Sequence, residues 1–573
     1  MKSLLLLAAT ICCACCSCVQ PKHYPDYSVS SGFALDSLDA RDPQVIENLG
    51  VTCRVWGYVK YHHPVFADST LNVDYELFGL LPQVAKATPE ERNRVLYEWV
   101  KGLGRFNTDK AEYDEALKTV KCTRTADLLW MDDTARLGNA LPRLLRELRY
   151  AKREANRYTD FTANAGNFVM RNESTAGSSD DCGYRMLFLF RFWNVIEYFS
   201  PNRNLTDTPW GEIPEKYIPL FIPGQTPGNP NQAMLLRELC DSHSASVRYN
   251  MFGYNTVPAE VRNADDRVFV IADGPLRKGD EILSIDGRGW KSTHDGLARF
   301  EAASNAENRN YMAAMCMVCS HRDTAAVELV RDGRRMTERI ATRSVMNWSP
   351  YITERMLDTA NIRLLADGIG YMTGVNYTKA DGARIMEKFR DTKALIVDLR
   401  CYPREFMIFD FIGRYFMPRT SPHVIWLAPT GALPGVFHEL QDSLFVNPDN
   451  PAVAENPAYY KGRVIVLVDS STQSQAEYTA MAFQATPRCT VVGTQTAGAD
   501  GNISALVMPG GDFGYFSGLG VLYPDGTNTQ RAGIRIDVPV HATVPGLQAG
   551  RDEILEKALE IIATGAYDPA AKI

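Results

Sequence analysis

The chain has 573 residues, of which 45% are hydrophobic and 23% are charged, and its net charge is -7. This length and composition are typical of a globular protein with about three or four domains. Acidic and basic residues are interspersed along the chain, which argues against the concentrated positive charge of a nucleic-acid-binding surface. We therefore expect no nucleic-acid partner.

The N-terminus has the pattern of a secretory signal. A positive charge at Lys2 precedes the apolar run Leu4–Ile11, which is too short to span a bilayer as a permanent helix. A cluster of cysteines follows, and a cysteine after a small residue at this point resembles a bacterial lipoprotein cleavage site. We expect residues 1–18 to be a lipoprotein-type signal with Cys15 or Cys18 as the lipidated residue; a cleaved signal without a lipid is the alternative.

Residues 19–40 are polar and predict a tether. The mature protein is thus expected to be exported and lipid-anchored in the cell envelope, in the periplasm or at the outer membrane. The later cysteines lack the rhythm of a disulfide framework. Cys316 and Cys319 have metal-type spacing without a second pair nearby, so we expect no metal and no other cofactor.

Two segments of the next region resemble each other. Arg54–Pro64 and Arg191–Pro201 share Arg, Trp, Tyr and Pro at identical spacing, with apolar residues at helical spacing. They predict two related helical hairpins, the first in an N-terminal helical domain (41–160) and the second in a further helical domain (182–260). The paired residues indicate core packing; the alternative is a substrate groove, for example for carbohydrate, lined by Trp56, Tyr61, Trp193 and Tyr198.

The pattern changes from about residue 262 to residue 345. Short strands alternate with turns, and one helical stretch follows from about residue 295. The segment Lys278-Gly-Asp-Glu-Ile-Leu-Ser-Ile-Asp-Gly287 resembles the signature of a PDZ domain. Such domains capture extended peptides or C-termini by strand addition, so the resemblance implies that residues 262–345 help to bind a polypeptide.

Residues 346–565 contain continuous apolar strands that alternate with helical stretches, which predicts an α/β layer with βαβ units. Within it, Val464–Tyr478 combines a buried strand, a small polar loop and the start of a helix, with Ser474 at the junction. Helix N-termini offer free N–H groups and a positive dipole end, which can stabilise an oxyanion beside an attacking hydroxyl. The alternative is that Ser474 is only an N-cap, with Glu477 completing a capping box.

Several motifs resemble the C-terminal-processing (tail-specific) serine peptidases, in their tricorn-core-like branch and in the lipoprotein form of Bacteroidetes. They are Ser474-Gln-Ala-Glu477, Val492–Gly498, Gln530–Asp537 and the strand Leu395–Arg400. The resemblance implies an α+β multidomain fold with an N-terminal helical region, a PDZ-like β-rich domain and an α/β catalytic core (346–565) of the ClpP/crotonase type. It also implies that Ser474 is a nucleophile.

The general base expected from most bacterial relatives is missing. Their lysine follows the threonine of the Val492–Gly498 motif, and Ala499 stands in its place here. The tricorn-like branch instead uses a histidine before the PDZ domain, and the resemblance assigns that role to His243, beside Ser242. Gln530 occupies about the position of that branch's catalytic glutamate, and the third catalytic partner stays open between Gln530, Asp241 and Asp500.

The resemblance gives the oxyanion donors less clearly. The family's strand usually ends in Arg-x-Asn-Gly-Gly, whose backbone helps to bind the oxyanion, but here it ends in Arg400–Arg404, where Pro403 has no N–H to give. The backbone N–H of Gln475 is therefore the first candidate, and Tyr402 is a weaker one. Together these features predict a serine-type endopeptidase that cleaves exported or cell-envelope polypeptides. The alternative is a catalytically impaired, peptide-binding envelope lipoprotein of the same fold.

Overall fold

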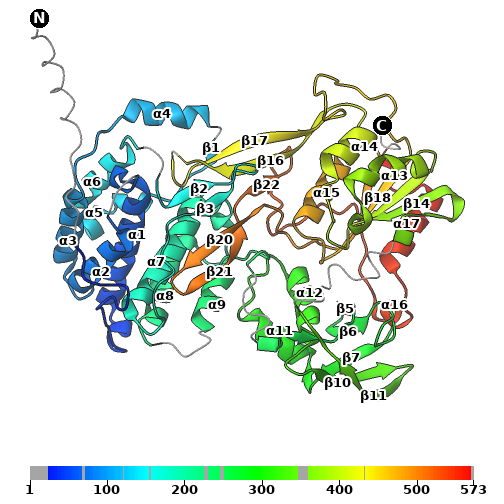
Figure 1. Cartoon of the computed structure of the whole chain (residues 1–573), viewed down its shortest axis with the longest axis horizontal. Coiled ribbons are helices and arrows are strands. Elements are labelled where there is room, and N and C mark those ends of the chain that lie inside the picture. The colour runs from blue at the N-terminus through cyan, green and yellow to red at the C-terminus, as the bar shows by residue number, and fades with distance from the viewer. Residues whose placement is uncertain are drawn as a thin grey trace, which may run out of the picture.

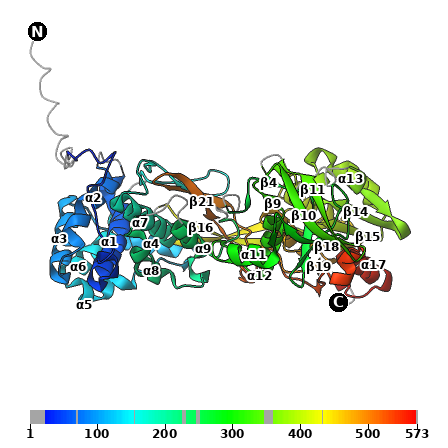
Figure 2. The ribbon, with the colours of Figure 1, turned by 90° about the horizontal axis from the view of Figure 1, so that it is seen from below.

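A computed structural model describes residues 23–67, 71–120, 122–153, 156–224, 230–244, 251–345, 359–431 and 433–569. The predicted signal segment, with Cys15 and Cys18, lies outside these residues. The molecule is elongated, with N-terminal helices at one end and a sheet flanked by helices at the other, and a β-rich unit lies against that sheet domain (Figures 1 and 2). Among the described residues, no helix has the length and apolar character needed to cross a membrane.

The helical region is built around two buried helices. Its helices are α1 (Pro43–His62), α2 (Val73–Val84), α3 (Pro89–Gly102), α4 (Lys110–Thr119), α5 (Thr134–Leu137), α6 (Ala140–Arg149), α7 (Cys182–Phe199), α8 (Ile213–Phe221) and α9 (Pro230–Arg237). Helices α1 and α7 are buried almost all round, as expected of core helices. Each ends before a residue in extended conformation that precedes a proline, which disfavours further helix.

The two similar sequence segments form equivalent structures. Trp56 Nε1 donates to the carbonyl oxygen of Val73 at 2.8 Å, and Trp193 Nε1 donates to that of Trp210 at 2.8 Å, in both cases 17 residues downstream. Both indoles are at most 2% exposed. The predicted helical hairpins are therefore α1–α2 and α7–α8. Core packing is confirmed, and the alternative of an aromatic substrate groove is wrong because the rings face the interior.

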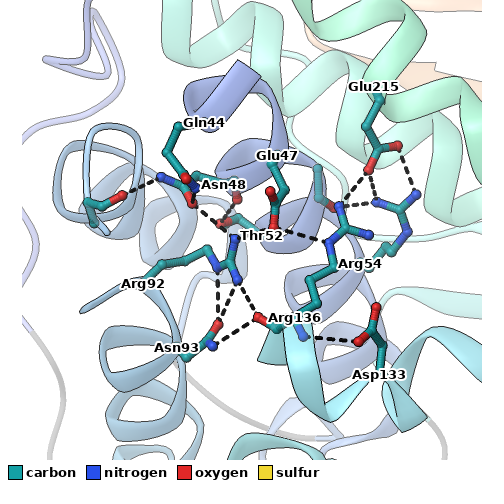
Figure 3. Close-up of polar contacts among 12 residues, drawn as sticks. Gln44, Glu47, Asn48, Thr52, Arg54, Arg92, Asn93, Asp133, Arg136 and Glu215 are labelled. Carbon is teal, nitrogen blue, oxygen red and sulfur yellow. Dashed lines mark hydrogen bonds and ion pairs between the residues drawn. The ribbon is translucent and has the colours of Figure 1, made fainter. Parts of the chain in front are cut away.

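Charged groups tie the helices together (Figure 3). Arg54 of the first hairpin donates to Glu215 of the second at 2.8 Å, and Arg136 donates to the same carboxylate at 3.0 Å. In the reciprocal direction, Arg191 of the second hairpin donates to Asp74 of the first at 2.7 Å. Each hairpin thus supplies one arginine that pairs with a carboxylate of the other hairpin.

The β-rich unit contains the strands that the sequence predicts. Its main sheet has the order β11-β10-β7-β6-β5, made of β5 (Val261–Ala264), β6 (Arg267–Val270), β7 (Glu281–Ile285), β10 (Thr324–Arg331) and β11 (Arg334–Ala341), with β8 (Arg288–Gly289) beside β7. Helices α11 (Trp290–Ala298) and α12 (Ala306–Met317) complete it, and a small sheet joins β4 (Asn255–Thr256), β9 (Cys319–Ser320) and β12 (Arg343–Ser344). The turn at Asp286 and Gly287 has positive φ at both residues, which suits a tight hairpin.

The C-terminal domain holds a six-stranded sheet of order β13-β14-β15-β18-β19-β23. The strands are β13 (Arg363–Leu365), β14 (Ile369–Thr373), β15 (Ala394–Asp398), β18 (Arg463–Val468), β19 (Cys489–Gly493) and β23 (Val538–Pro539). All pairs are parallel except β13 with β14. Helices α13 (Gly382–Phe389), α14 (Arg414–Phe416) and α15 (Gln475–Gln484) cover one face, and α17 (Glu553–Thr564) covers the other. The predicted α/β layer is confirmed.

Two hairpins leave this domain and extend toward the N-terminal helices (Figure 1). Strands β16 (Ser421–Pro429) and β17 (Phe437–Leu444) form a sheet with β22 (Gly520–Leu522) and β1 (Cys122–Arg124). Strands β20 (Ile503–Met508) and β21 (Gly511–Ser517) form the second hairpin. Apolar residues of this hairpin, Leu506, Met508 and Phe516, belong to the same hydrophobic core as α1 and α7. The sequence did not predict this docking.

Candidate active site

Ser474 follows a rigid loop at the carboxyl end of β18. Asp469 organises the loop, because its carboxylate accepts from Ser471 N at 2.8 Å and from Arg262 Nε at 2.9 Å. Thr472 Oγ1 donates to the carbonyl oxygen of Leu399 at the end of the neighbouring strand, at 2.9 Å. Burial opposes the charge on Asp469, but Arg262 and Arg400 outweigh it and lower the pKa of its carboxyl. The loop is thus held by Arg262 of the β-rich unit and by the carbonyl oxygen of Leu399 after β15.

Ser474 has a strained backbone. It is the N-cap of α15, with φ 56° and ψ -122°, whereas N-cap residues usually adopt extended conformations. This combination of φ and ψ is disfavoured for residues with a Cβ, and holding such a residue there costs about 1–3 kcal/mol of conformational free energy. A capping interaction contributes only about 1 kcal/mol. The capping box with Glu477 is present, so Ser474 is an N-cap, but capping alone does not account for this geometry.

Glu477 fastens the nucleophile loop to the segment that follows β19. Its buried carboxyl accepts from Thr496 Oγ1 at 2.5 Å, from Gly498 N at 2.8 Å and from Ala499 N at 3.0 Å. The carbonyl oxygen of Ala499 in turn accepts from Ser474 N at 3.0 Å. These bonds hold the strained conformation, and they place Ala499 directly beside Ser474.

Asp500 adds a second buried carboxyl next to Glu477. It is 4% exposed, and within the described part of the chain neither of its carboxyl oxygens has a hydrogen-bond partner. Burial raises the pKa of Asp500, and the nearby Glu477 raises it further. Burial also raises the pKa of Glu477, although its hydrogen bonds oppose the shift. The two carboxyls therefore resist carrying two negative charges at once.

His243 lies in the loop after α9, with its side chain 8% exposed. Its backbone N donates to Asp241 Oδ1 at 3.1 Å. The ring contacts a residue from the far end of the chain, since Nδ1 lies 2.9 Å from Ser517 Oγ. The other ring nitrogen, Nε2, is buried and has no hydrogen-bond partner among the residues that the structure describes. Burial lowers the pKa of His243, and the carboxylate of Asp241 partly offsets this, so the ring is neutral near pH 7.

The loop that carries His243 is docked on the nucleophile loop through Ser242. Gln473 Nε2 donates to the carbonyl oxygen of Ser242 at 3.2 Å. Ser242 Oγ donates to the carbonyl oxygen of Ala497 at 3.2 Å and accepts from Ser304 N at 2.8 Å. Segments from the helical region, the β-rich unit and the C-terminal domain therefore meet within one hydrogen-bonded cluster around Ser242.

The other predicted site residues lie along the same loops. Gln475 is the first residue of α15, where N–H groups have no acceptor within the helix. Gln530 is 6% exposed, and the next residue, Arg531, donates its N–H to the carbonyl oxygen of Gly498 at 2.8 Å. Tyr402 is half-buried in the loop after β15. The side-chain Nε2 atoms of Gln475 and Gln530 are buried, and no described residue is a hydrogen-bond partner of either.

Buried polar atoms normally have hydrogen-bond partners, so a group of them without partners is informative. Around the loop 497–501, counting only contacts between described residues, the atoms without a partner are His243 Nε2, Gln475 Nε2, Gln530 Nε2 and both carboxyl oxygens of Asp500. A cavity of about 470 Å³ lies nearby, between the β-rich unit and the strand ends. Its walls include Asp469 and Ser470 but not Ser474.

Sequence reasoning missed Ser517. No local motif marks it, because its position depends on how the β20–β21 hairpin packs against the helical region. The sequence leaves Asp241 as one of three alternatives for the third catalytic partner, and no local pattern predicts its contacts with Ser517. Cys316 and Cys319 are both buried.

One protein family matches part of the chain. Residues 438–540, which contain Ser474, match the model of peptidase family S41. This part of the chain is similar to that family. No curated protein matches the chain.

Solved structures align with a larger share of the chain. Mature CPAF complexed with lactacystin aligns at 13% identity with a TM-score of 0.49, over 67% of this chain and 98% of that one. A putative peptidase from Parabacteroides merdae aligns at 15% identity with a TM-score of 0.41, over 66% and 96%. The tricorn protease aligns at 13% identity with a TM-score of 0.32, over 71% and 42%. All three identities lie below 25% and all three TM-scores below 0.5.

Proposed function

We propose that the protein is a serine endopeptidase in which Ser474 is the nucleophile and His243 is the general base. The main support is the strained backbone of Ser474 at a strand-loop-helix junction. This junction lies within residues 438–540, which match peptidase family S41. Such strain persists only where the surroundings enforce it, and it is found mainly at functional sites. The serine nucleophiles of α/β-hydrolases occupy a similar strained turn between a strand and a helix.

In this mechanism Ser474 Oγ attacks the carbonyl carbon of a peptide bond, and His243 Nε2 accepts the hydroxyl proton. The neutral ring, kept so by burial, suits a base near pH 7. His243 then returns the proton to the leaving amine, which leaves an acyl-enzyme on Ser474. Water activated by the same histidine hydrolyses this ester and restores the serine.

The oxyanion is stabilised by the N-terminus of α15. The backbone N–H of Gln475 is the principal donor, with that of Tyr402 as a weaker candidate, and the dipole of a ten-residue helix favours negative charge there. The unpartnered amides of Gln475 and Gln530 are further donors for the carbonyl oxygens of a bound chain. A polypeptide would satisfy these groups, and the PDZ-like β-rich unit would present it.

Hydrolysis of fluorescein-labelled casein tests the proposal. Ser474→Ala is expected to lower the rate by roughly 10³-fold or more, and His243→Gln by a similar factor, because the two groups act as a unit. Ser443→Ala, on strand β17, is the matched control and should retain full activity, because Ser443 has no role in the proposed mechanism. Equal rates in wild type and Ser474→Ala would exclude Ser474 as the nucleophile.

A second candidate function is peptide binding without hydrolysis. It is favoured by the fully buried Ala499, which places no titratable group where related peptidases carry their lysine, and by Gln530, which has no charge with which to stabilise an imidazolium. This alternative predicts that wild-type protein binds a fluorescent peptide and returns it uncleaved. The casein assay therefore separates the two functions.

We also propose that the protein is exported and lipid-anchored through Cys15 or Cys18. The short apolar run and the cysteines that follow it support this. In a Gram-negative host the wild-type protein should incorporate radiolabelled fatty acid. One of the two variants, Cys15→Ser or Cys18→Ser, should lose this label. Label retained in both single variants and in the double variant would contradict lipid attachment at these positions.

A further inference from the structure

The hydroxyl of Ser517 connects His243 to Asp241. His243 Nδ1 lies 2.9 Å from Ser517 Oγ, and Ser517 Oγ donates to Asp241 Oδ1 at 3.0 Å. The ring nitrogen itself is 3.7 Å from that carboxylate oxygen, beyond hydrogen-bond range. Ser517 N donates to the other oxygen of Asp241 at 2.6 Å. All three groups are buried or nearly so.

The donor and acceptor roles in this chain follow from counting hydrogens. Both oxygens of Asp241 accept from backbone N–H groups, those of His243 and Ser517, as a carboxylate does. A carboxylate cannot donate, so the single hydroxyl hydrogen of Ser517 is used toward Asp241. Ser517 Oγ must then accept from His243, which requires a hydrogen on Nδ1. In the neutral ring this leaves Nε2 without a hydrogen and with a free lone pair.

Ser517 reaches this position through the packing of its hairpin. It is the last residue of β21, and the β20–β21 hairpin packs against α7 (Figure 1), with Leu506 and Phe516 in the core of the helical region. Ser244 Oγ also donates to the carbonyl oxygen of Tyr515 at 2.6 Å, which ties the histidine loop to the same strand. The position of Ser517 is therefore rigidly defined.

We propose that Ser517 and Asp241 are positioning residues, which hold His243 in the tautomer with hydrogen on Nδ1 so that Nε2 can accept the proton of Ser474. Their catalytic role rests on the function proposed above, whereas the tautomer is a property of the folded protein and is measurable without activity. The serine hydroxyl here does what a carboxylate in direct contact with the ring does in a Ser-His-Asp triad. It transmits the orienting effect of Asp241 across a gap too long for direct bonding.

The tautomer is read from ¹H–¹⁵N spectra of full-length protein labelled with [¹⁵N]histidine, with His243→Gln to assign the signals. Wild type should show His243 with hydrogen on Nδ1. Ser517→Ala should remove this preference and give a mixture of tautomers or the Nε2–H form. Ser504→Ala, a buried serine on the other strand of the same hairpin, controls for hairpin packing and should leave the tautomer unchanged.

Kinetics supply the second readout. Ser517→Ala should lower kcat for casein by about tenfold or more, because a histidine base in the wrong tautomer cannot accept the serine proton. KM should change little. If Ser517→Ala does not fold, Asp241→Asn replaces it, with the same expected loss of the Nδ1–H form. A wild-type His243 with hydrogen on Nε2, or a tautomer that does not respond to either variant, would overturn the inference. Inactive wild-type protein with the expected tautomer would overturn the proposed function alone.

Discussion

The side chain of Asn194 occupies the space that a Cβ atom on Gly57 would need. These residues hold equivalent positions in α1 and α7, and a Cβ built on Gly57 would come within 1.8 Å of Asn194 Cγ. Asn194 Nδ2 donates to the carbonyl oxygens of Cys53 at 3.0 Å and Phe190 at 2.8 Å, so it bridges the two helices. Residue 57 of α1 must therefore be glycine, because any side chain there would collide with the amide of Asn194 in α7.

Gly57→Ala should therefore destabilise the protein, because the amide of Asn194 cannot move without breaking its own bonds. Overpacking of this kind costs about 1–3 kcal/mol, which corresponds to a fall in Tm of roughly 2–10 °C for a domain of this size. The control is Gly79→Ala in α2, where the new Cβ meets nothing within 4 Å and should be neutral or stabilising. Equal Tm values for the two variants would show that α1 and α7 are not in close contact at Gly57.

The buried ion pairs between the hairpins should be needed for stability. Arg191 is fully buried and pairs with Asp74 at 2.7 Å and with Glu173 at 3.1 Å. Arg191→Met leaves both carboxylates without this partner, which costs about 3–5 kcal/mol and should lower Tm by roughly 10 °C.

Arg146→Met is the matched control for this substitution. Arg146 pairs with Asp132 at 2.6 Å, but both side chains are exposed, so its loss should cost less than about 1 kcal/mol. Differential scanning fluorimetry of both variants provides the test. A Tm for Arg191→Met within 1–2 °C of that of Arg146→Met, set against the roughly 10 °C expected, would mean that the charges between the hairpins do not stabilise the fold.

Asp500 should make the stability of the protein fall as pH rises. Burial and the neighbouring Glu477 raise the pKa of its carboxyl in the folded state above its unfolded value. Between those two pKa values the folded protein binds more protons than the unfolded chain, so stability declines with increasing pH. Asp500→Asn removes this group, and its Tm advantage over wild type should be larger near pH 8 than near pH 5.

Asp332→Asn, in the exposed turn between β10 and β11, is the control for that measurement and should show the same Tm difference at both pH values. If Asp500→Asn also gave equal differences at both pH values, Asp500 would be ionised in the folded protein at the lower pH. The melting curves thus report the protonation of a carboxyl beside Ser474.

Much of the fold follows from local sequence patterns. The apolar run Val464–Val468 predicts a buried strand, the small polar residues after it predict a loop, and the helix begins at Gln475 as expected. Trp56 and Trp193 occupy equivalent buried positions because helical spacing and a terminal proline are local signals.

The parts that could not be predicted depend on tertiary contacts. The strained backbone of Ser474 is enforced by Glu477 and by the carbonyl oxygen of Ala499, and no propensity at residue 474 indicates it. Ser517 contacts His243 across 274 residues, through a hairpin whose docking is decided by the core that it enters. Sequence motifs therefore point to candidate residues, whereas the hydrogen bonds that orient them emerge only from the folded chain.

The pairing of Ser474 with His243 is tested most directly by mapping, with mass spectrometry of full-length protein, the covalent adduct formed with a fluorophosphonate probe. We expect a single adduct on Ser474 in wild type, and we expect it to form about 100-fold or more slowly in His243→Gln because the base is missing. Ser443→Ala should label at the wild-type rate. An adduct on a different serine, or equal labelling of Ser474 in wild type and His243→Gln, would contradict the pairing of Ser474 with His243.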